Sequence, residues 1–158
     1  MIRLTRLADY AVVLMSHLAY HPDELYNATD TAEATGLPMP TVSKILSLMA
    51  KGGLLASHRG LNGGFTLARP PAKISVADIV SVVDGPIALT ECVDDSASDC
   101  SFELACPARG PWHKINAAVK RALEEVTLAD IVTPFGHSAS EMQPASAPAP
   151  AKSEDRAH

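Results

Sequence analysis

The sequence predicts a mainly α-helical fold with one short β-hairpin and a long C-terminal helix. Hydrophobic residues recur at three- and four-residue intervals in four segments, whereas residues 54–68 form two short runs about a glycine-rich turn. Hydrophobic residues make up 47% of the 158 residues and aromatic residues only 4%, so we expect an aliphatic core. Residues 84–111 show no clear period and contain all three cysteines, which indicates a loop that a ligand or metal organises.

Three helices are expected before the hairpin, over about residues 3–20, 28–35 and 40–51. Their boundaries rest on residues that cap, start or break helices, namely Pro22, Asn27, Gly36, Pro40 and Gly52. The third helix has an inner face formed by Val42, Ile45, Leu46 and Met49. A helix-turn-helix arrangement follows from the glycine turn between the second and third helices.

The hairpin is expected to pair residues 54–58 with residues 64–68. Ser75 then caps a fourth helix that runs to Val83. A longer helix covers about residues 112–126, and Thr127 with Asp130 indicates a cap for one more turn. The long helix has a hydrophobic stripe formed by Trp112, Ile115, Val119, Ala122, Leu123 and Val126.

The net charge of −5 conceals an uneven distribution. No Asp or Glu occurs in residues 34–77, whereas residues 76–158 carry 13 acidic and 6 basic side chains. The acid-free stretch contains the basic residues Lys44, Lys51, Arg59, Arg69 and Lys73. A surface that faces phosphate needs local positive potential rather than a basic total. Charge alone fits a nucleic-acid surface and an ordinary solvated face equally well.

The helices and the hairpin together predict a winged helix-turn-helix that binds double-stranded DNA. The third helix presents polar side chains away from its hydrophobic stripe, namely Thr41, Ser43, Lys44 and Ser47. Short hydroxyls at the start of a helix can bond phosphates or base edges. In the hairpin, Gly60 lets the backbone approach the duplex, and Arg59, with Asn62 close by, can enter a minor groove or pair with phosphate. The alternative is a winged helix used for protein contacts.

The cysteines Cys92, Cys100 and Cys106 follow a C-x7-C-x5-C spacing. In a reducing cytosol they are expected to be ligands or redox sensors rather than structural disulfides. Three thiolates can hold an iron–sulfur cluster if a fourth ligand comes from elsewhere. Zinc also accepts three thiolates and a histidine, for which His113 is the nearest candidate, although no C-x2-C pair is present. A thiol–disulfide switch is a third interpretation.

A membrane protein and an enzyme are both disfavoured. No run approaches the roughly 20 apolar residues that a membrane span needs. The N-terminus lacks the uninterrupted apolar run of a signal peptide, so we expect a cytoplasmic protein with no membrane partner. No phosphate loop or nucleophile elbow is present, and Ser57 and His58 are adjacent in a strand, where their side chains point to opposite faces.

Over about residues 1–133 these motifs together resemble the Rrf2 family of bacterial transcription regulators, which includes IscR and NsrR. The resemblance is carried by Arg3-Leu4-Thr5, Asp9-Tyr10-Ala11, Leu37-Pro38, Thr41-Val42-Ser43-Lys44, Arg59-Gly60, Gly63-Gly64-Phe65-Thr66-Leu67-Ala68 and the cysteine triplet. Within the family, the chain looks most like the branch that regulates the SUF iron–sulfur assembly operon. That likeness is carried by Leu7-Ala8-Asp9-Tyr10-Ala11-Val12-Val13-Leu14, Glu91-Cys92-Val93, Cys106-Pro107, Trp112, Ile115-Asn116 and Leu128-Ala129-Asp130.

The resemblance implies a homodimer that binds operator DNA and represses cluster-assembly genes while it holds an iron–sulfur cluster. The implied organisation is a DNA-binding domain at 1–83, a cluster-binding loop at 84–111, a dimerisation helix at 112–133 and a disordered tail at 134–158. A nitric-oxide- or redox-sensing repressor like NsrR is the alternative on the same scaffold. A zinc-stabilised winged-helix interaction module is the alternative from another class.

The resemblance leaves the fourth cluster ligand to be chosen. IscR-like members use a histidine three residues after the last cysteine, where this chain has Arg109. NsrR-like members use a carboxylate near the N-terminus of the other subunit, and Asp9 occupies the matching place. We therefore expect Asp9 to be the fourth ligand, with His113 second. Three cysteines and one carboxylate favour a [4Fe–4S] cluster over a [2Fe–2S] cluster.

Overall fold

The computed structural model describes residues 3–60, 63–93 and 106–132. Its elements, in chain order, are α1 (Arg6–Ala19), α2 (Ala28–Thr35), α3 (Met39–Lys51), β1 (Leu55–His58), β2 (Gly64–Leu67), η1 (Pro71–Lys73), α4 (Val76–Asp84), η2 (Glu91–Val93), α5 (Arg109–Glu125) and α6 (Leu128–Val132). The mainly helical prediction with one hairpin is confirmed. No helix within these ranges is both long enough and apolar enough to cross a membrane.

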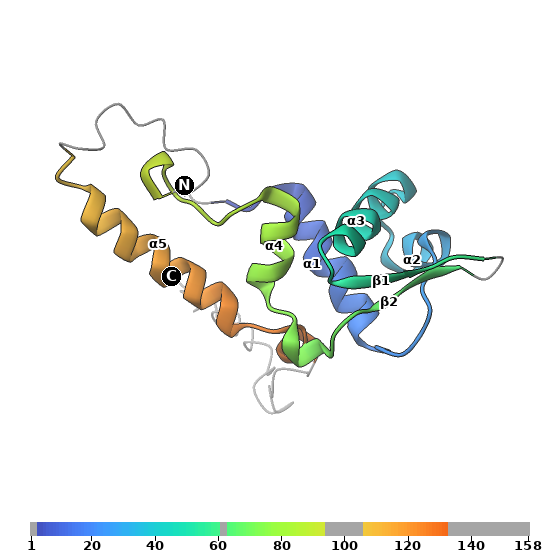
Figure 1. Ribbon diagram of the computed structural model, residues 1–158. Helices are drawn as coiled ribbons and strands as arrows, with labels where there is room; N and C mark the ends of the chain where they lie inside the picture. Colours follow the sequence, from blue (N-terminus) through green and yellow to red (C-terminus); the bar gives the residue numbers. More distant parts are fainter. Residues whose placement is uncertain (1–2, 61–62, 94–105, 133–158) are drawn as a thin grey trace, which may run out of the picture.

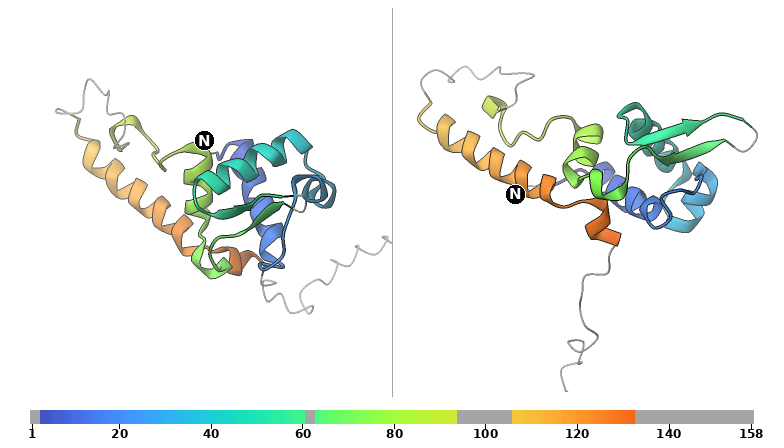
Figure 2. Two further views of the ribbon diagram at one scale, coloured as in Figure 1. Left: turned by 45° about the vertical axis from the view of Figure 1, so that its right-hand side comes forward. Right: turned by 60° about the horizontal axis from the view of Figure 1, so that its bottom comes forward.

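The helices α1 and α4 lie at the centre of the molecule (Figure 1). On one side of them are α2, α3 and the two strands, and on the other side α5 runs outward with its N-terminal end farthest from the strands (Figures 1 and 2). The central core is aliphatic, with fully buried side chains that include Leu14, Leu18, Ile45, Leu46, Met49 and Ile79. The predicted inner face of α3 is therefore confirmed, because all four of its residues are buried.

Local side-chain bonds set most helix starts. Asn27 accepts a hydrogen bond from the Asp30 amide at 2.8 Å, as predicted for the cap of α2. Ser75 and Asp78 form a capping box at the start of α4. The first helix begins at Arg6 rather than near residue 3, because Thr5 is its N-cap and accepts from the Ala8 amide at 3.1 Å.

The two strands form an antiparallel pair in which Leu55 lies opposite Leu67 and His58 opposite Gly64. They are slightly shorter than predicted. The segment after α1 extends this small sheet, because Tyr26 and Phe65 exchange backbone hydrogen bonds of 2.9 and 2.8 Å. The wing is thus fastened to the helical core through Tyr26, a contact that the local sequence pattern did not indicate.

The long helix α5 begins at Arg109, not near residue 112 as predicted, so the loop ends earlier than the expected boundary at 111. Pro111 does not end the loop but lies in the first turn of α5, where its missing N–H has no partner to lose. After α5 the chain returns to the core: the Leu128 amide bonds the Ile74 carbonyl at 2.9 Å, and Leu128 is fully buried in the predicted extra turn, α6.

Candidate DNA interface and cysteine loop

The predicted reading side chains lie on the outer surface of α3. Lys44 and Ser47 are exposed, and Thr41 and Ser43 are half-buried. The Ser43 hydroxyl lies 3.1 Å from the Met39 Sδ atom and donates to it. Met39 itself is 46% exposed at the first position of α3, although the sequence pattern had not singled it out. The structure thus brings the four predicted residues together on one helix and adds an exposed methionine at its start.

The wing presents Arg59 and Gly60 as exposed residues beyond the end of β1. Gly60 has a φ of 129°, a conformation that favours glycine, and its carbonyl accepts from the Gly63 amide at 3.0 Å. His58 Nε2 lies 3.0 Å from the Thr66 hydroxyl across the strand pair. The predicted contact residue Asn62 lies outside the described residues.

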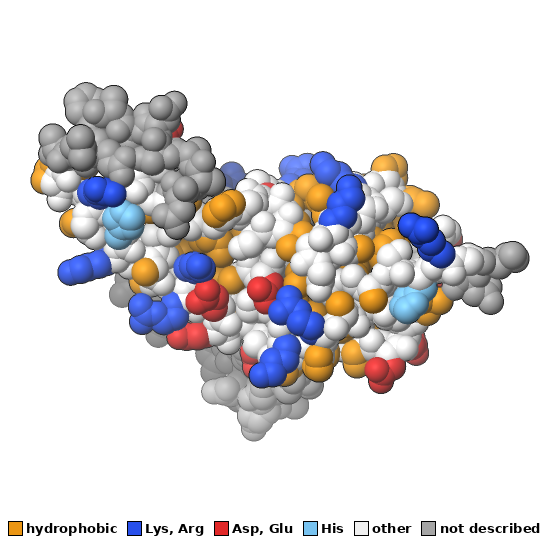
Figure 3. Space-filling view, viewed as in Figure 1, with side chains coloured by type: hydrophobic (Ala, Val, Ile, Leu, Met, Phe, Trp, Pro, Cys, Tyr) orange, Lys and Arg blue, Asp and Glu red, His pale blue; other side chains and the backbone are white. Residues whose placement is uncertain are grey.

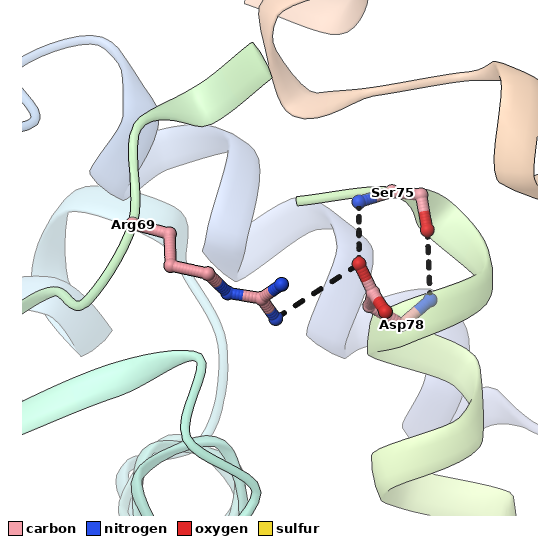
Figure 4. A network of polar contacts seen from close by, with 3 residues as sticks. All are labelled: Arg69, Ser75 and Asp78. Atoms are coloured by element: carbon pink, nitrogen blue, oxygen red, sulfur yellow. Dashed lines mark hydrogen bonds and ion pairs between the residues drawn. The ribbon is translucent and has the colours of Figure 1, made fainter. Parts of the chain in front are cut away.

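Lysine and arginine side chains are visible over α3 and the strands, and no acidic side chain is visible over these elements in the same view (Figure 3). The acid-free stretch of the sequence therefore forms part of one surface. Arg69 differs, because its guanidinium points towards α4 and lies 4.0 Å from Asp78 Oδ2 (Figure 4). That carboxylate oxygen also accepts from the Ser75 amide at 3.0 Å, so Arg69 connects the base of the wing to the cap of α4.

The cysteine loop is described at both of its ends. Cys92 lies in η2 and Cys106 lies just before α5, and both are half-buried free thiols. The third cysteine, Cys100, lies outside the described residues. The Cys92 Sγ atom is 3.2 Å from the Thr90 hydroxyl. The two described thiols therefore stand at either end of residues 94–105.

Asn116 of α5 holds the start of this loop in place. Its Oδ1 atom accepts from the Leu89 amide at 3.0 Å, and its Nδ2 atom donates to the Ile87 carbonyl at 3.0 Å. The turn η2, which follows these residues, also packs against α5. The sequence motif Ile115-Asn116 did not by itself indicate this role. A polar side chain amid the hydrophobic stripe of α5 was the signal that could have indicated its role.

The two candidates for the fourth ligand, Asp9 and His113, lie on different helices. Asp9 is exposed in the first turn of α1, beside a shallow cavity of about 410 Å³ lined by Arg3, Leu4, Thr5 and Arg6. His113 is exposed on α5. Within the part of the chain that the structure describes, no three His, Cys, Asp or Glu side chains gather into a metal site.

The N-terminus of α1 is bonded to the end of α4, where the cysteine loop begins. The Thr5 hydroxyl lies 2.8 and 3.0 Å from the two carboxylate oxygens of Asp84 and donates to that carboxylate. Thr5 thus caps α1 and also connects it to the helix that leads into the loop. Asp9 therefore sits one helical turn from a direct link between α1 and the cysteine loop.

The outer part of α5 exposes hydrophobic side chains. Trp112 and Ile115 are 36% and 44% exposed, and α5 contains no buried residue along its length. A helix that packs on its own chain along one side and still exposes such side chains is typical of an interface between proteins.

A family profile with the description "Iron-dependent Transcriptional regulator", Rrf2, matches residues 4–134. The chain belongs to the Rrf2 family. An HTH-type transcriptional regulator of Mycobacterium tuberculosis is 35% identical over 131 residues, which cover 82% of this chain and 80% of that protein. The regulator NsrR of Halalkalibacterium halodurans is 30% identical over 132 residues, which cover 83% and 90%.

Solved structures of Rrf2-type regulators have the same fold. CymR of B. subtilis, the global cysteine regulator, superimposes with a TM-score of 0.66 at 29% identity and covers 84% of this chain and 97% of that chain. IscR of T. potens gives a TM-score of 0.63 at 27% identity and covers 83% and 86%. The chain is therefore a winged-helix transcriptional regulator of the Rrf2 family and not an enzyme.

Proposed function

We propose that this Rrf2 regulator is a cytoplasmic, iron–sulfur-cluster-dependent repressor of SUF cluster-assembly genes that binds operator DNA as a homodimer. The observation that carries the proposal is the placement of Cys92 and Cys106, two half-buried thiols at the ends of one loop. Asn116 holds the first end of that loop against α5, and Cys106 leads directly into the same helix. Cys100 falls between them in the sequence.

The donor set fits an iron–sulfur cluster that takes one ligand from outside the loop. Thiolates are the usual ligands of iron–sulfur clusters, and three of them leave one position for a fourth donor. Asp9 is exposed, so a second subunit can approach it. We infer that Cys92, Cys100 and Cys106 of one subunit and Asp9 of the other hold a [4Fe–4S] cluster. A cluster bound in this way would link the two subunits. The link would break when the cluster is oxidised or when clusters are in short supply.

The chain itself offers a route from this site to the DNA-binding surface. The helix that carries Asp9 packs against both α4 and α3, and α3 presents the reading residues. The bond from Thr5 to Asp84 joins the N-terminus of α1 to the end of α4. If Asp9 held the cluster of the other subunit, cluster loss would free α1 and would change the spacing of the two reading helices in the dimer.

On the DNA side, Thr41, Ser43, Lys44 and Ser47 of α3 are assigned to the major groove, as expected for a recognition helix. In the wing, Arg59, Gly60 and Asn62 are assigned to the backbone or minor groove. The exposed stripe of α5 is assigned to the dimer interface, because burial of Trp112 and Ile115 against a second copy removes apolar surface from water.

The decisive experiment is purification of the full chain without oxygen, followed by absorption spectroscopy and by iron, sulfide and zinc analysis. We expect a brown protein with iron and sulfide in equal amounts and binding to SUF operator DNA that is lost when the cluster is removed. A colourless protein that contains zinc and binds DNA without salt dependence would overturn the proposal in favour of the zinc-stabilised interaction module.

The fourth ligand is tested by comparing Asp9→Ala with His113→Ala. We expect Asp9→Ala to change the cluster spectrum and to abolish the difference in DNA affinity between the cluster-bound and cluster-free forms. His113→Ala is the matched control and should preserve both properties. The reverse result would assign the ligand to His113.

A nitric-oxide sensor is the second candidate function, favoured by the similarity to NsrR and by the NsrR-like position of Asp9. The two functions differ in their signal. Titration of the cluster-bound protein with nitric oxide should leave SUF operator binding intact until the cluster is destroyed. Release of DNA at one or two nitric oxide molecules per cluster would instead favour the sensor.

A further inference from the structure

The start of α3 carries an exposed apolar surface formed by Pro38, Met39 and Pro40, here called the apolar tip. Met39 is the first residue of the helix and is 46% exposed, among the most exposed large hydrophobic side chains of the described residues. The rest of the outer surface of α3 carries hydroxyls and two lysines, Lys44 and Lys51, so the apolar tip differs in chemistry from the residues that follow it.

The apolar tip is poorly equipped to hold a phosphate. A helix N-terminus usually offers free backbone N–H groups and a polar cap to an anion. Here the N-cap residue is Pro38, which makes no side-chain cap bond, and Pro40 has no N–H. The Thr41 amide is already bonded to the Pro38 carbonyl at 2.9 Å. Besides the Met39 amide, the contact that this end of the helix offers is van der Waals contact through the exposed Met39 side chain.

Met39 is also held in register with the reading residues. Residues four apart lie on one side of a helix, so Met39, Ser43 and Ser47 follow one another along the same edge of α3. The 3.1 Å contact from the Ser43 hydroxyl to the Met39 sulfur joins the first two of them. A contact made by Ser43 in the major groove therefore brings the methionine to the neighbouring base pair.

We propose that Met39 determines operator specificity by packing its thioether side chain against the C5-methyl group of a thymine in the major groove. The thymine methyl is the apolar feature that base pairs display there, and a flexible, polarisable methionine fits it without a fixed rotamer. This inference rests on the proposed binding of DNA through α3. It adds that Met39, the first residue of this helix, selects thymine.

The test uses the full-length protein and a duplex selected from a random-sequence library, with each thymine replaced in turn by uracil, which lacks the methyl group. Dissociation constants are measured by fluorescence anisotropy. We expect one thymine in each half-site whose replacement weakens wild-type binding by about fourfold, the effect of one buried methyl group. With Met39→Ala, thymine and uracil at that position should bind equally well.

Two further variants separate this role from a structural one. Met39→Leu keeps the apolar volume and should retain the preference for thymine. Tyr20→Ala removes an exposed hydrophobic side chain at the end of α1 and should leave both affinity and preference unchanged.

The outcomes are distinct. The proposal is overturned if no thymine replacement affects the wild type, or if Met39→Ala weakens thymine and uracil duplexes by the same factor. It is also overturned if Met39→Ala changes only the oligomeric state, because the apolar tip would then contact protein. Failure of the wild type to bind any selected duplex in a salt-dependent manner would instead reject the proposed DNA-binding function itself.

Discussion

At the scale of single residues, short polar side chains position the candidate sites. Thr5 caps α1 and donates to Asp84, and Asn116 holds the loop that leads to Cys92. Asp130 stabilises the start of α6, where its carboxylate accepts from the Thr127 amide at 2.8 Å and from the Thr127 hydroxyl at 2.7 Å. These two bonds lower the pKa of Asp130 below its ordinary value of 3.8.

The lowered pKa predicts a specific pH dependence of stability. A carboxylate with a depressed pKa in the folded state stabilises that state at pH values above its ordinary pKa, and the contribution is lost as the pH falls through the folded value. We expect Asp130→Asn to lower the urea midpoint at neutral pH and to approach the wild type in acid. Thr127→Val, which removes one of the two donors, should lie between them. Parallel pH profiles for all three proteins would contradict this prediction.

At the scale of elements, the wing depends on a close approach between β2 and the segment after α1. A Cβ atom on Gly64 would lie 2.6 Å from the Tyr26 carbonyl oxygen, and neither backbone can move without breaking the Tyr26–Phe65 pair. The wing can therefore pair with Tyr26 in this way only because residue 64 is glycine.

We expect Gly64→Ala to destabilise the protein by about 1–3 kcal/mol in urea unfolding, because overpacking forces the backbone to shift. DNA affinity should also fall, since the wing loses its anchor. Gly110→Ala is the matched control: a Cβ there meets no atom within 4 Å, and alanine favours a helix. Equal midpoints for the two variants would show that the wing tolerates the shift.

The loop before η2 depends on α5 in a comparable way. Asn116→Ala removes both bonds to the loop and should cost about 1–3 kcal/mol, since a partly buried amide and carbonyl lose their partners. In the cluster-bound protein, absorbance should also bleach faster in air. Asn116→Asp retains an acceptor for the Leu89 amide and should show a smaller loss on both measurements. Unchanged stability in Asn116→Ala would mean that η2 is held by other contacts.

At the scale of the whole molecule, α5 projects from the core (Figure 2). Its hydrophobic stripe is partly exposed. The end of α5 is attached to the core through the Val126 carbonyl, which accepts from the Val76 amide at 2.9 Å. The opposite end carries Trp112 and Ile115 and is the part best placed to meet a second copy of the chain.

We expect Ile115→Lys to weaken dimerisation by about 2 kcal/mol, or about thirtyfold, because a charge replaces an apolar side chain in the exposed part of the stripe. Sedimentation equilibrium measures this change. Ala117→Lys places the same charge at an exposed position two residues on, on the other side of the helix, and should leave the dimer intact. A wild-type protein that stays monomeric at micromolar concentration would remove the role assigned to α5.

The sequence by itself was sufficient for the order of the helices and the hairpin and for the caps of α2 and α4, because the hydrogen bonds at Asn27, Gly36 and Ser75 join residues only three or four apart. The same local chemistry predicted the polar outer surface of α3. The start of α5 was misplaced because a proline in a first turn has the same appearance in sequence as one that ends a loop.

Only the tertiary structure decided which distant residues support the candidate sites. Thr5 and Asp84 are 79 positions apart, and Asn116 reaches back 27 positions to Leu89. Contacts between residues so far apart in the sequence leave no local pattern, because each of these residues also fits the local sequence of its own helix or loop. Packing also left Met39 exposed at the start of α3. The polar residues next to it on this helix could be predicted from their spacing alone.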